Sequence, residues 1–408
     1  MSHIVIIGAG ECGARAAFAL REKNFDGQIT LVGAEDHLPY ERPPLSKEAL
    51  LHGHAPKLVA DAARYADAGI ELLIGISVES IDPAGKTVQL SNGGGLIYDR
   101  LLLTTGARPR PFPGLSGQNE RIRTLRTHGD AAVLRTVLQP GKHLAIIGGG
   151  FIGLELAATA RKLGARVTLL EGLPRILTRG VPEEIAAVVA ARHRAEGVEI
   201  ICGAKIRSLE ESRDEAKIQL EDGRTIAADM IVVGIGAMPN VELARDSGLA
   251  IDNGIAVDAY LRTSAADIFA AGDCCSFPLP HYGGRRVRLE AWRNAQDQGA
   301  LAAANLLGAE EATSAVPWFW SDQYDLTLQI AGLADGAAET VRRDMVDGAF
   351  ILFHLDASGR LIAASGIGTG NVVARDIRLA EMMIAAGVRP DPAALAAPGT
   401  KLKSLLAA

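Results

Sequence analysis

The 408-residue chain lacks the features of a secreted, membrane-spanning or nucleic-acid-binding protein. Its four cysteines, Cys12, Cys202, Cys274 and Cys275, form neither a disulfide framework nor a metal-binding spacing, so we expect no metal site. No apolar run approaches the roughly 18 residues that a membrane-spanning helix needs. The net charge of −6 argues against nucleic acid as a partner, because phosphate binding calls for a basic face.

The length and composition indicate a multidomain α/β protein. A chain of 408 residues is too long for one core, and we expect two or three domains. The 45 glycines and the 48% hydrophobic content are typical of a globular α/β fold. The first strand pattern begins at the N-terminus and leaves no room for a signal peptide, so we expect a cytoplasmic protein.

The chain contains one pattern twice: an aliphatic strand, a G-x-G-x-x-G turn and an Ala-rich helix. The glycines of these turns are Gly8, Gly10 and Gly13 in the first copy and Gly148, Gly150 and Gly153 in the second. Such a turn lets backbone N–H groups approach a pyrophosphate at the positive end of the helix. Because the pattern occurs twice, we expect the chain to bind two dinucleotides.

A carboxylate follows the second strand of each copy, where a ribose would be bound. In the first copy it is Glu35 or its neighbour Asp36, and the sequence does not decide between them. In the second copy it is Glu171, which would accept a hydrogen bond from the 2′-hydroxyl of NAD and repel the 2′-phosphate of NADP. Arg175 is close enough to leave NADP in consideration.

Polar residues also lie at several turns where a ligand would fit. In the segment 39–47, two prolines hold Arg42 and Lys47 on a rigid turn, and Ser46 is placed to cap a following helix. A Thr-Gly turn after an apolar strand presents Thr105 and Arg108. For Arg42 and Lys47, solvated surface charge is an equal alternative.

The chain after residue 266 contains further candidates for contact with a ligand. The strand 267–271 delivers Asp273 through a glycine, where its carboxylate would suit a polyol chain. The N–H groups at the start of a helix predicted to end near residue 307 would face a ligand carbonyl. After residue 316, Trp318 and Trp320 suggest either a core or a cleft wall, and their polar neighbours favour the wall.

We expect strands at 327–331, 339–343, 350–355 and 361–365 and a helix at 371–385 in a small α+β domain.

As an ordered set, these motifs resemble the NADH-dependent ferredoxin reductases of bacterial oxygenase systems, including the biphenyl-type dioxygenase reductases and the putidaredoxin-reductase-like oxidoreductases. The matching motifs are GAGECG, RPPLSK, TTGARPR, GGGFIGLE, VTLLE, VVGIG, AAGD, WRNAQ and PWFWSDQ. The resemblance implies a glutathione-reductase-like α/β architecture, with two Rossmann-like domains and a small C-terminal α+β domain. It implies a split FAD-binding domain at 1–111 and 244–315, an NAD-binding domain at 112–243 and a C-terminal domain at 316–408.

The resemblance also implies which residues bind each cofactor. For FAD they are Gly8, Gly10, Gly13, Glu35, Arg42, Lys47, Thr105, Arg108, Asp273, Ala291 and Trp292. For NADH they are Gly148, Gly150, Ile152, Gly153, Glu171 and Gly236. The residues implied in catalysis are Lys47, Glu155 and Trp320. Within this pattern, Glu11 and Cys12 are unusual residues for the first glycine turn.

The implied activity is electron transfer from NADH through FAD, one electron at a time, to a small 2Fe-2S ferredoxin, with rubredoxin as an alternative acceptor. A flavin links the two-electron hydride donor to the one-electron acceptor. Lys47 is expected to steady the charge of reduced flavin, and Glu155 to pair with it across the domain boundary. The oxygenase served would act in aromatic hydrocarbon catabolism.

Ferredoxins of this kind are acidic, and the chain itself is at −6, so docking is expected to use a local basic patch. The candidate arginines are Arg285, Arg286, Arg288, Arg293, Arg342 and Arg343.

Other functions remain as alternatives on the same pattern. A disulfide reductase would need C-x-x-C or C-x4-C, and neither spacing occurs. An NADH oxidase would want a reactive cysteine within residues 38–51, which contain none. A redox-signalling flavoprotein similar to apoptosis-inducing factor would use the same folds and would reduce iron–sulfur acceptors only slowly.

Overall fold

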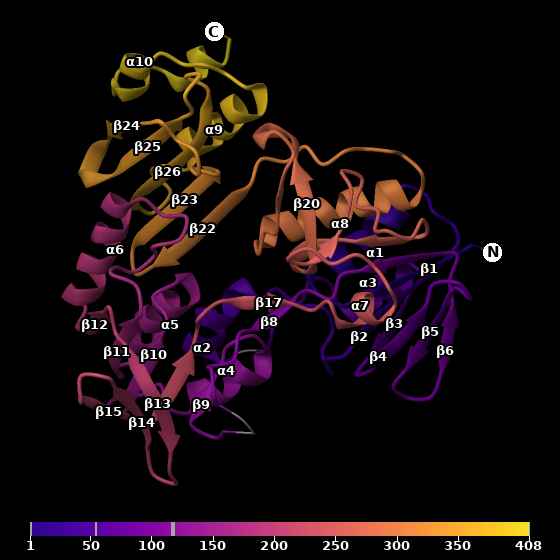
Figure 1. Ribbon diagram of the computed structural model, residues 1–408, viewed down its shortest axis with the longest axis horizontal. Coiled ribbons are helices and arrows are strands. Elements are labelled where there is room, and N and C mark those ends of the chain that lie inside the picture. The colour runs from indigo at the N-terminus through magenta and orange to yellow at the C-terminus, as the bar shows by residue number, and fades with distance from the viewer. Residues whose placement is uncertain (1, 54, 116–118, 408) are drawn as a thin grey trace. The chain divides into compact units, whose positions relative to one another are not determined.

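The aliphatic runs of the sequence form the centres of two parallel sheets, one in each of two units (Figure 1). The computed structural model describes residues 2–53, 55–115 and 119–407. Unit 1 consists of Met1–Glu41, Lys57–Arg108 and Met238–Pro317, and unit 2 of Arg42–Pro56, Pro109–Ala237 and Trp318–Ala408. These units are defined by internal packing, and the three-domain division by cofactor stays a prediction.

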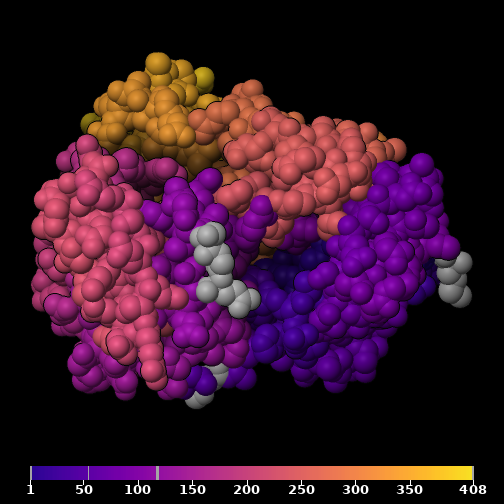
Figure 2. Space-filling model, turned by 60° about the horizontal axis from the view of Figure 1, so that its bottom comes forward, coloured from indigo at the N-terminus to yellow at the C-terminus, as the bar shows by residue number. Residues whose placement is uncertain are grey.

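Unit 1 is organised around a five-stranded parallel sheet in the order β19-β7-β1-β2-β3. Its strands are β1 (His3–Ile7), β2 (Gln28–Gly33), β3 (Ile70–Ile74), β7 (Arg100–Leu103) and β19 (Ile268–Ala270). Helices α1 (Glu11–Glu22) and α8 (Trp292–Leu306) pack against each other. In Figure 2 the salmon surface of the later segment of unit 1 borders the purple surface of its N-terminal segments. The predicted strand–turn–helix–strand of the first copy is confirmed.

Unit 2 repeats this arrangement in the order β12-β11-β10-β16-β9, also fully parallel. Its strands are β9 (Ile122–Arg123), β10 (His143–Ile147), β11 (Arg166–Glu171), β12 (Val198–Cys202) and β16 (Met230–Val233). Helix α5 (Phe151–Lys162) follows the second glycine turn, and α6 (Glu183–Ala195) precedes β12. All five residues of β10 are buried, which explains the unbroken apolar run of the four residues after His143.

The repetition extends to side chains near the amino ends of the two sheets. In each unit a histidine on the first strand contacts a threonine on the second, and the threonine hydroxyl donates to a glutamate on the third. The two sets are His3, Thr30 and Glu71, with contacts of 2.8 and 2.8 Å, and His143, Thr168 and Glu199, with contacts of 2.9 and 2.8 Å. The two units therefore share a construction that the glycine turns alone do not reveal.

Smaller elements complete both units. Three-stranded antiparallel sheets are formed in unit 1 by β4 (Val78–Asp82), β5 (Thr87–Leu90) and β6 (Gly95–Ile97), and in unit 2 by β13 (Ile206–Glu211), β14 (Ala216–Leu220) and β15 (Thr225–Ala228). The short strands are β8 (Ala107–Pro109), β17 (Ala237–Pro239), β18 (Ile255–Ala256), β20 (Cys275–Leu279) and β21 (Arg285–Val287). The short helices are α2 (Glu48–His52), α3 (Ala62–Asp67), α4 (His128–Arg135) and α7 (Glu242–Asp246).

The C-terminal part of unit 2 is a five-stranded antiparallel sheet in the order β22-β23-β26-β25-β24, with α9 packed against it. Its elements are β22 (Trp318–Gln323), β23 (Leu326–Gly332), β24 (Glu339–Asp344), β25 (Phe350–Leu355), β26 (Leu361–Thr369), α9 (Ala374–Ala386) and α10 (Pro392–Ala396). The four predicted strands and the helix are confirmed, and the tryptophan segment adds an edge strand. Among the described residues, none of the helices has the length and apolar character that a bilayer crossing requires.

Candidate active site

Two of the three glycines in each turn are required by the fold itself. Gly8 and Gly148 have φ of +114° and +113°, and a Cβ on either would lie 2.2 Å from a backbone carbonyl oxygen. A Cβ on Gly13 or Gly153 would lie 2.1 or 2.2 Å from the carbonyl oxygen of the first glycine in the same turn. A side chain at the first glycine would collide with the backbone just after the neighbouring strand, β7 or β16, and one at the third glycine would push the helix away from the turn.

The middle glycines, Gly10 and Gly150, instead face open space, with no described atom within 4 Å of a Cβ placed on either. Each is the N-cap residue of its helix, and in the described chain no side chain caps α1 or α5. By contrast, Thr127 and Asp130 form a complete capping box on α4. Uncapped N–H groups beside open space at a helix N-terminus fit a pyrophosphate, so both turns fit a dinucleotide.

The acids expected to bind the riboses are held by specific contacts. Glu171, at the end of β11, accepts hydrogen bonds from the backbone N–H of Gly149 at 2.7 Å and of Leu173 at 2.8 Å. Its carboxylate therefore lies against the second glycine turn. Glu35 is half-buried and accepts from the Tyr40 hydroxyl at 2.5 Å, whereas Asp36 is exposed. The choice of Glu35 for the FAD ribose stays a prediction.

The predicted Thr-Gly turn is tied to the segment around Asn240. The Thr105 hydroxyl donates to the Asn240 carbonyl at 2.6 Å, and Arg108 donates to the Asn240 side chain at 2.7 Å. Arg108 also makes a two-pronged contact with Glu242, and this hydrogen bond lowers the pKa of Glu242. The charge of Arg108 is therefore compensated within unit 1, and its contact with a cofactor stays a prediction.

The start of α8 brings several polar groups towards the first glycine turn. Ala291 is the N-cap of α8, Trp292 is its first residue, and no side chain in the described chain caps this helix. Glu11 accepts a hydrogen bond from Gln296, and burial raises the pKa of Glu11. Asp273, half-buried, lies in a short 3-10 turn after β19.

Gln298 is a residue of this region that sequence reasoning missed. Its side-chain oxygen accepts from the Gly272 N–H at 2.7 Å, while its buried amide nitrogen has no partner among the described residues. A buried donor without a partner is rare in a native fold and fits a ligand acceptor. The only signal in the sequence was its position two residues beyond the WRNAQ motif.

Lys47 and Glu155 meet in unit 2. The Lys47 Nζ lies 3.2 Å from Glu155 Oε1, and their side chains are 17% and 10% exposed. The hydroxyls of Ser46 and Ser321 each donate to the Glu155 carboxylate at 2.6 Å. The predicted contact is present, but both partners belong to unit 2, because the segment 42–56 packs there rather than with unit 1. The prediction that Ser46 caps a helix is wrong, since its hydroxyl is used by Glu155 and α2 has Lys47 as its N-cap.

The remaining predicted residues of unit 2 lie on several elements. Trp320, on β22, stacks on Trp318 with ring centroids 5.3 Å apart. Arg42 donates to the Arg126 carbonyl at 2.7 Å. Ile152, directly inside the second glycine turn, has a side chain 52% exposed, and Gly236, with φ of +108°, follows β16. An exposed isoleucine beside an uncapped helix start fits contact with a ligand.

Residues 2–299 match the family described as pyridine nucleotide-disulphide oxidoreductase, and residues 318–406 match one described as reductase C-terminal. The first match spans most of the chain and contains both glycine turns. The chain belongs to the pyridine nucleotide-disulphide oxidoreductase family.

Similar proteins agree with this assignment over nearly the full length. The oxidoreductase is 44% identical to the anthranilate 1,2-dioxygenase system ferredoxin–NAD(+) reductase component of Burkholderia cepacia, with 98% of each chain covered. It is 40% identical to the corresponding p-cumate 2,3-dioxygenase component of Pseudomonas putida, with 99% and 98% covered. The reductase in the covalent putidaredoxin reductase–putidaredoxin complex is 36% identical, with a TM-score of 0.94 and coverage of 100% and 98%. The predicted cofactors, FAD and NADH, are confirmed by this membership.

Most of the arginines expected to dock a ferredoxin contact other groups of the oxidoreductase itself. Arg343 is buried and donates to four carbonyls of the C-terminal segment, those of Leu395, Ala397, Pro398 and Thr400, so it is not a docking residue. Arg288 is paired with Glu290, and its side chain is 11% exposed. Arg286 donates to two backbone carbonyls. Arg285 is exposed, with its guanidinium 5.9 Å from the centroid of the Tyr282 ring, and remains a member of the predicted patch.

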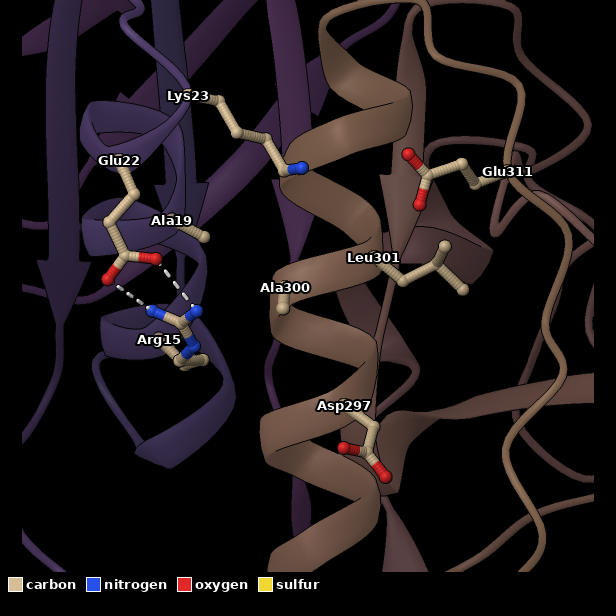
Figure 3. Close-up of a pocket in the computed structure, with 8 residues that line it drawn as sticks. All are labelled: Arg15, Ala19, Glu22, Lys23, Asp297, Ala300, Leu301 and Glu311. Atoms are coloured by element: carbon tan, nitrogen blue, oxygen red, sulfur yellow. Dashed lines mark hydrogen bonds and ion pairs between the residues drawn. The ribbon is translucent and has the colours of Figure 1, made fainter.

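A groove of about 430 Å³ lies between α1 and α8 (Figure 3). Its lining is mixed in charge, and Arg15 is bonded to Glu22 through both oxygens at 2.8 Å. Glu22 and Lys23 lie at the C-terminal end of α1, nearly 20 Å along the helix from the glycine turn. Arg15, at the other end of the lining, lies two residues beyond Gly13, so the groove runs along α1 from near the glycine turn, although none of the three glycines lines it.

The four cysteines are free thiols, and Cys12, Cys274 and Cys275 are buried. Burial raises the pKa of Cys12 and Cys275 well above that of an exposed thiol. In the described parts of the chain, no three His, Cys, Asp or Glu side chains gather as a metal site would require.

Proposed function

We propose that this oxidoreductase passes electrons from NADH through FAD, one at a time, to a small 2Fe-2S ferredoxin serving an oxygenase of aromatic catabolism. The observation that carries the proposal is the near full-length likeness to reductase components of dioxygenase systems, tail included. Bound FAD supplies the step between a two-electron hydride donor and a one-electron acceptor. We place this activity in the cytoplasm, where free thiols such as these four are the norm.

The protein's own residues would bind the two cofactors, orient the NADH ribose and neutralise the charge of reduced flavin. The open middle glycines and uncapped helix starts of α1 and α5 would hold two pyrophosphates, and Glu171 would orient the NADH ribose. Lys47 would supply positive charge beside the reduced flavin, with Glu155 and two serine hydroxyls keeping its ammonium in place. Trp320 would line the flavin pocket. Because Lys47, Glu155 and the two serines are largely buried, water would be kept away from this ion pair.

The decisive experiment is NADH-driven reduction of a panel of ferredoxins and rubredoxins by the FAD-loaded protein, with dioxygen and peroxide as control acceptors. We expect rapid reduction of at least one 2Fe-2S ferredoxin and slow reaction with dioxygen. Rapid reduction of dioxygen with every iron–sulfur protein slow would instead support an NADH oxidase. Slow turnover with all acceptors would support a signalling flavoprotein.

The docking surface is tested by measuring ferredoxin reduction in the same assay at increasing salt concentrations. Charge reversal at Arg285 should lower the ferredoxin on-rate, and the effect should shrink near 0.15 M salt, where the screening length is about 8 Å. Arg207→Glu, at an exposed arginine of β13, is the matched control for net charge. Equal effects of the two reversals would exclude a local role for Arg285.

A further inference from the structure

The hydrogen bonds around Glu155 continue beyond the two serines into a buried chain of unit 2. The Gln323 amide nitrogen donates to the Ser321 hydroxyl at 3.1 Å, and the Gln323 oxygen lies 2.8 Å from His193 Nε2. The Tyr324 hydroxyl lies 3.4 Å from the other ring nitrogen of His193. His193 is fully buried on α6, while Ser321 and Gln323 are 1% and 4% exposed on β22.

The donors in this chain are set by the carboxylate at its end. An ionised Glu155 can only accept, so the single proton of Ser321 must point towards it. Ser321 must then accept from the amide group of Gln323, which turns the Gln323 oxygen towards His193. His193 must therefore carry its proton on Nε2. Burial lowers the pKa of His193, consistent with a neutral ring that has one N–H.

All the hydrogen bonds of this chain are donated in the same direction, from the side of α6 towards the Lys47–Glu155 ion pair. Each group donates towards Glu155: Tyr324 to His193, His193 to Gln323, Gln323 to Ser321, and Ser321 to the carboxylate. If the Gln323 amide were reversed, its oxygen would attract the Ser321 proton away from Glu155. The carboxylate would then lose one of the donors that hold it 3.2 Å from Lys47.

We propose that His193 is a positioning residue for the Lys47–Glu155 pair: its Nε2–H, donated to the Gln323 oxygen, stabilises the amide orientation that the carboxylate selects and so helps to keep the Ser321 hydroxyl donating to Glu155. Its consequence for catalysis rests on the proposed function, in which Lys47 serves the reduced flavin. The hydrogen-bond direction itself does not depend on that function. No sequence motif indicates the role, because His193 and Gln323 are far apart in the chain.

The first test is the tautomer of His193, read from ¹⁵N chemical shifts in histidine-labelled, FAD-loaded protein and assigned by its loss in His193→Phe. We expect the Nε2–H form in the native protein. Ser321→Ala frees the Gln323 amide and should convert His193 to a mixture of tautomers. Ser46→Ala, which removes the other serine donor to Glu155, should leave the tautomer unchanged. A native Nδ1–H form, or a tautomer indifferent to Ser321→Ala, would overturn the proposal.

The second test is the rate of FAD reduction by saturating NADH in single-turnover experiments. His193→Phe should slow it by about fivefold, as expected for loss of one buried hydrogen bond, with FAD content and NADH affinity unchanged. Ser321→Ala should do the same, and the double variant should lose no more than either single variant. His354→Phe, at a buried histidine of β25 that takes no part in these hydrogen bonds, should have no effect on this rate.

The outcomes separate the two proposals. Losses that multiply in the double variant would show that His193 and Ser321 act independently, and would refute the positioning role. If His193→Phe does not fold, His193→Asn supplies the assignment of the His193 signal, and the tautomer in Ser321→Ala still decides. Failure to reduce any ferredoxin would refute the proposed function, while the tautomer would still report on the hydrogen-bond direction.

Discussion

Substitutions at Gly150, the N-cap of α5, and at Gly153, in its first turn, distinguish an effect on NADH binding from an effect on folding. Gly150 has φ of −83° and ψ of −179°, an extended conformation that alanine adopts without strain. Because no described atom lies within 4 Å of its Cβ, Gly150→Ala should fold normally. A Gly→Ala change at a compatible position usually stabilises the folded state by about 0.4–1 kcal/mol through the unfolded chain. The free energy of unfolding without NADH should therefore be unchanged or slightly raised.

Gly153→Ala has the opposite effect on stability. The added Cβ would lie 2.2 Å from the Gly148 carbonyl oxygen, well inside the 3.4–4 Å of an ordinary contact. The Gly148 oxygen belongs to the backbone and the Cβ is fixed rigidly to its own Cα, so the strain is relieved only by moving α5 away from β10. Overpacking of this kind costs about 1–3 kcal/mol or more, and we expect a clear fall in the midpoint of thermal unfolding.

The assay compares NADH dissociation constants with unfolding midpoints measured without NADH. Gly150→Ala should weaken NADH binding by at least about tenfold, or 1.4 kcal/mol, because its methyl group enters the space required by the pyrophosphate. FAD binding should be unaffected. Wild-type NADH affinity in Gly150→Ala, or wild-type stability in Gly153→Ala, would refute the reasoning from the glycine turn.

Four further predictions follow from other contacts. Glu171→Gln should narrow the preference for NADH over NADPH, which we expect to be at least about tenfold, when catalytic efficiencies are compared. Lys47→Met should retain FAD, slow its reduction by NADH and lower its reduction potential, measured by dye equilibration. In native protein a thiol reagent should modify only the half-exposed Cys202, because the other three thiols are buried. His354→Phe should flatten the decline in stability between pH 6.5 and 4, followed by urea unfolding.

The sign of the His354 effect comes from its burial, which lowers its pKa to about 4. Between pH 6.5 and 4 the unfolded chain takes up a proton that the folded chain does not. Stability therefore falls as the pH is lowered through this window, by at most about 3 kcal/mol from this residue. An equal pH slope in His354→Phe would contradict the assignment.

The other predictions have equally direct tests. Unchanged cofactor preference in Glu171→Gln would show that the charge of this carboxylate does not discriminate against NADPH. An unchanged flavin potential in Lys47→Met would show that the Lys47–Glu155 pair is structural. Modification of a buried cysteine in native protein would show local opening of its unit.

Local patterns predicted the elements well because their signals are short-range. The glycine turns, the buried strands and the strands after residue 316 depend on spacing and periodicity that the sequence displays directly. The contacts that each charged side chain makes were harder to predict from the sequence. Arg343 and Arg342 are adjacent and look alike in the sequence, but Arg343 is buried against backbone carbonyls, whereas Arg342 pairs with Glu184 and Asp344 at the surface.

The sequence by itself determined two dinucleotide turns, a C-terminal α+β part and membership of a reductase family, because each depends on motifs that are contiguous in the chain. Only the tertiary structure decided that Ser46 bonds Glu155, that Lys47 and Glu155 lie in the same unit, and that Gln298 has a buried free donor. The first two facts concern residues about 100 or more positions apart, and the third concerns a polar atom without a partner among the described residues. Local periodicity does not encode such distances, because they arise only when separate elements pack together.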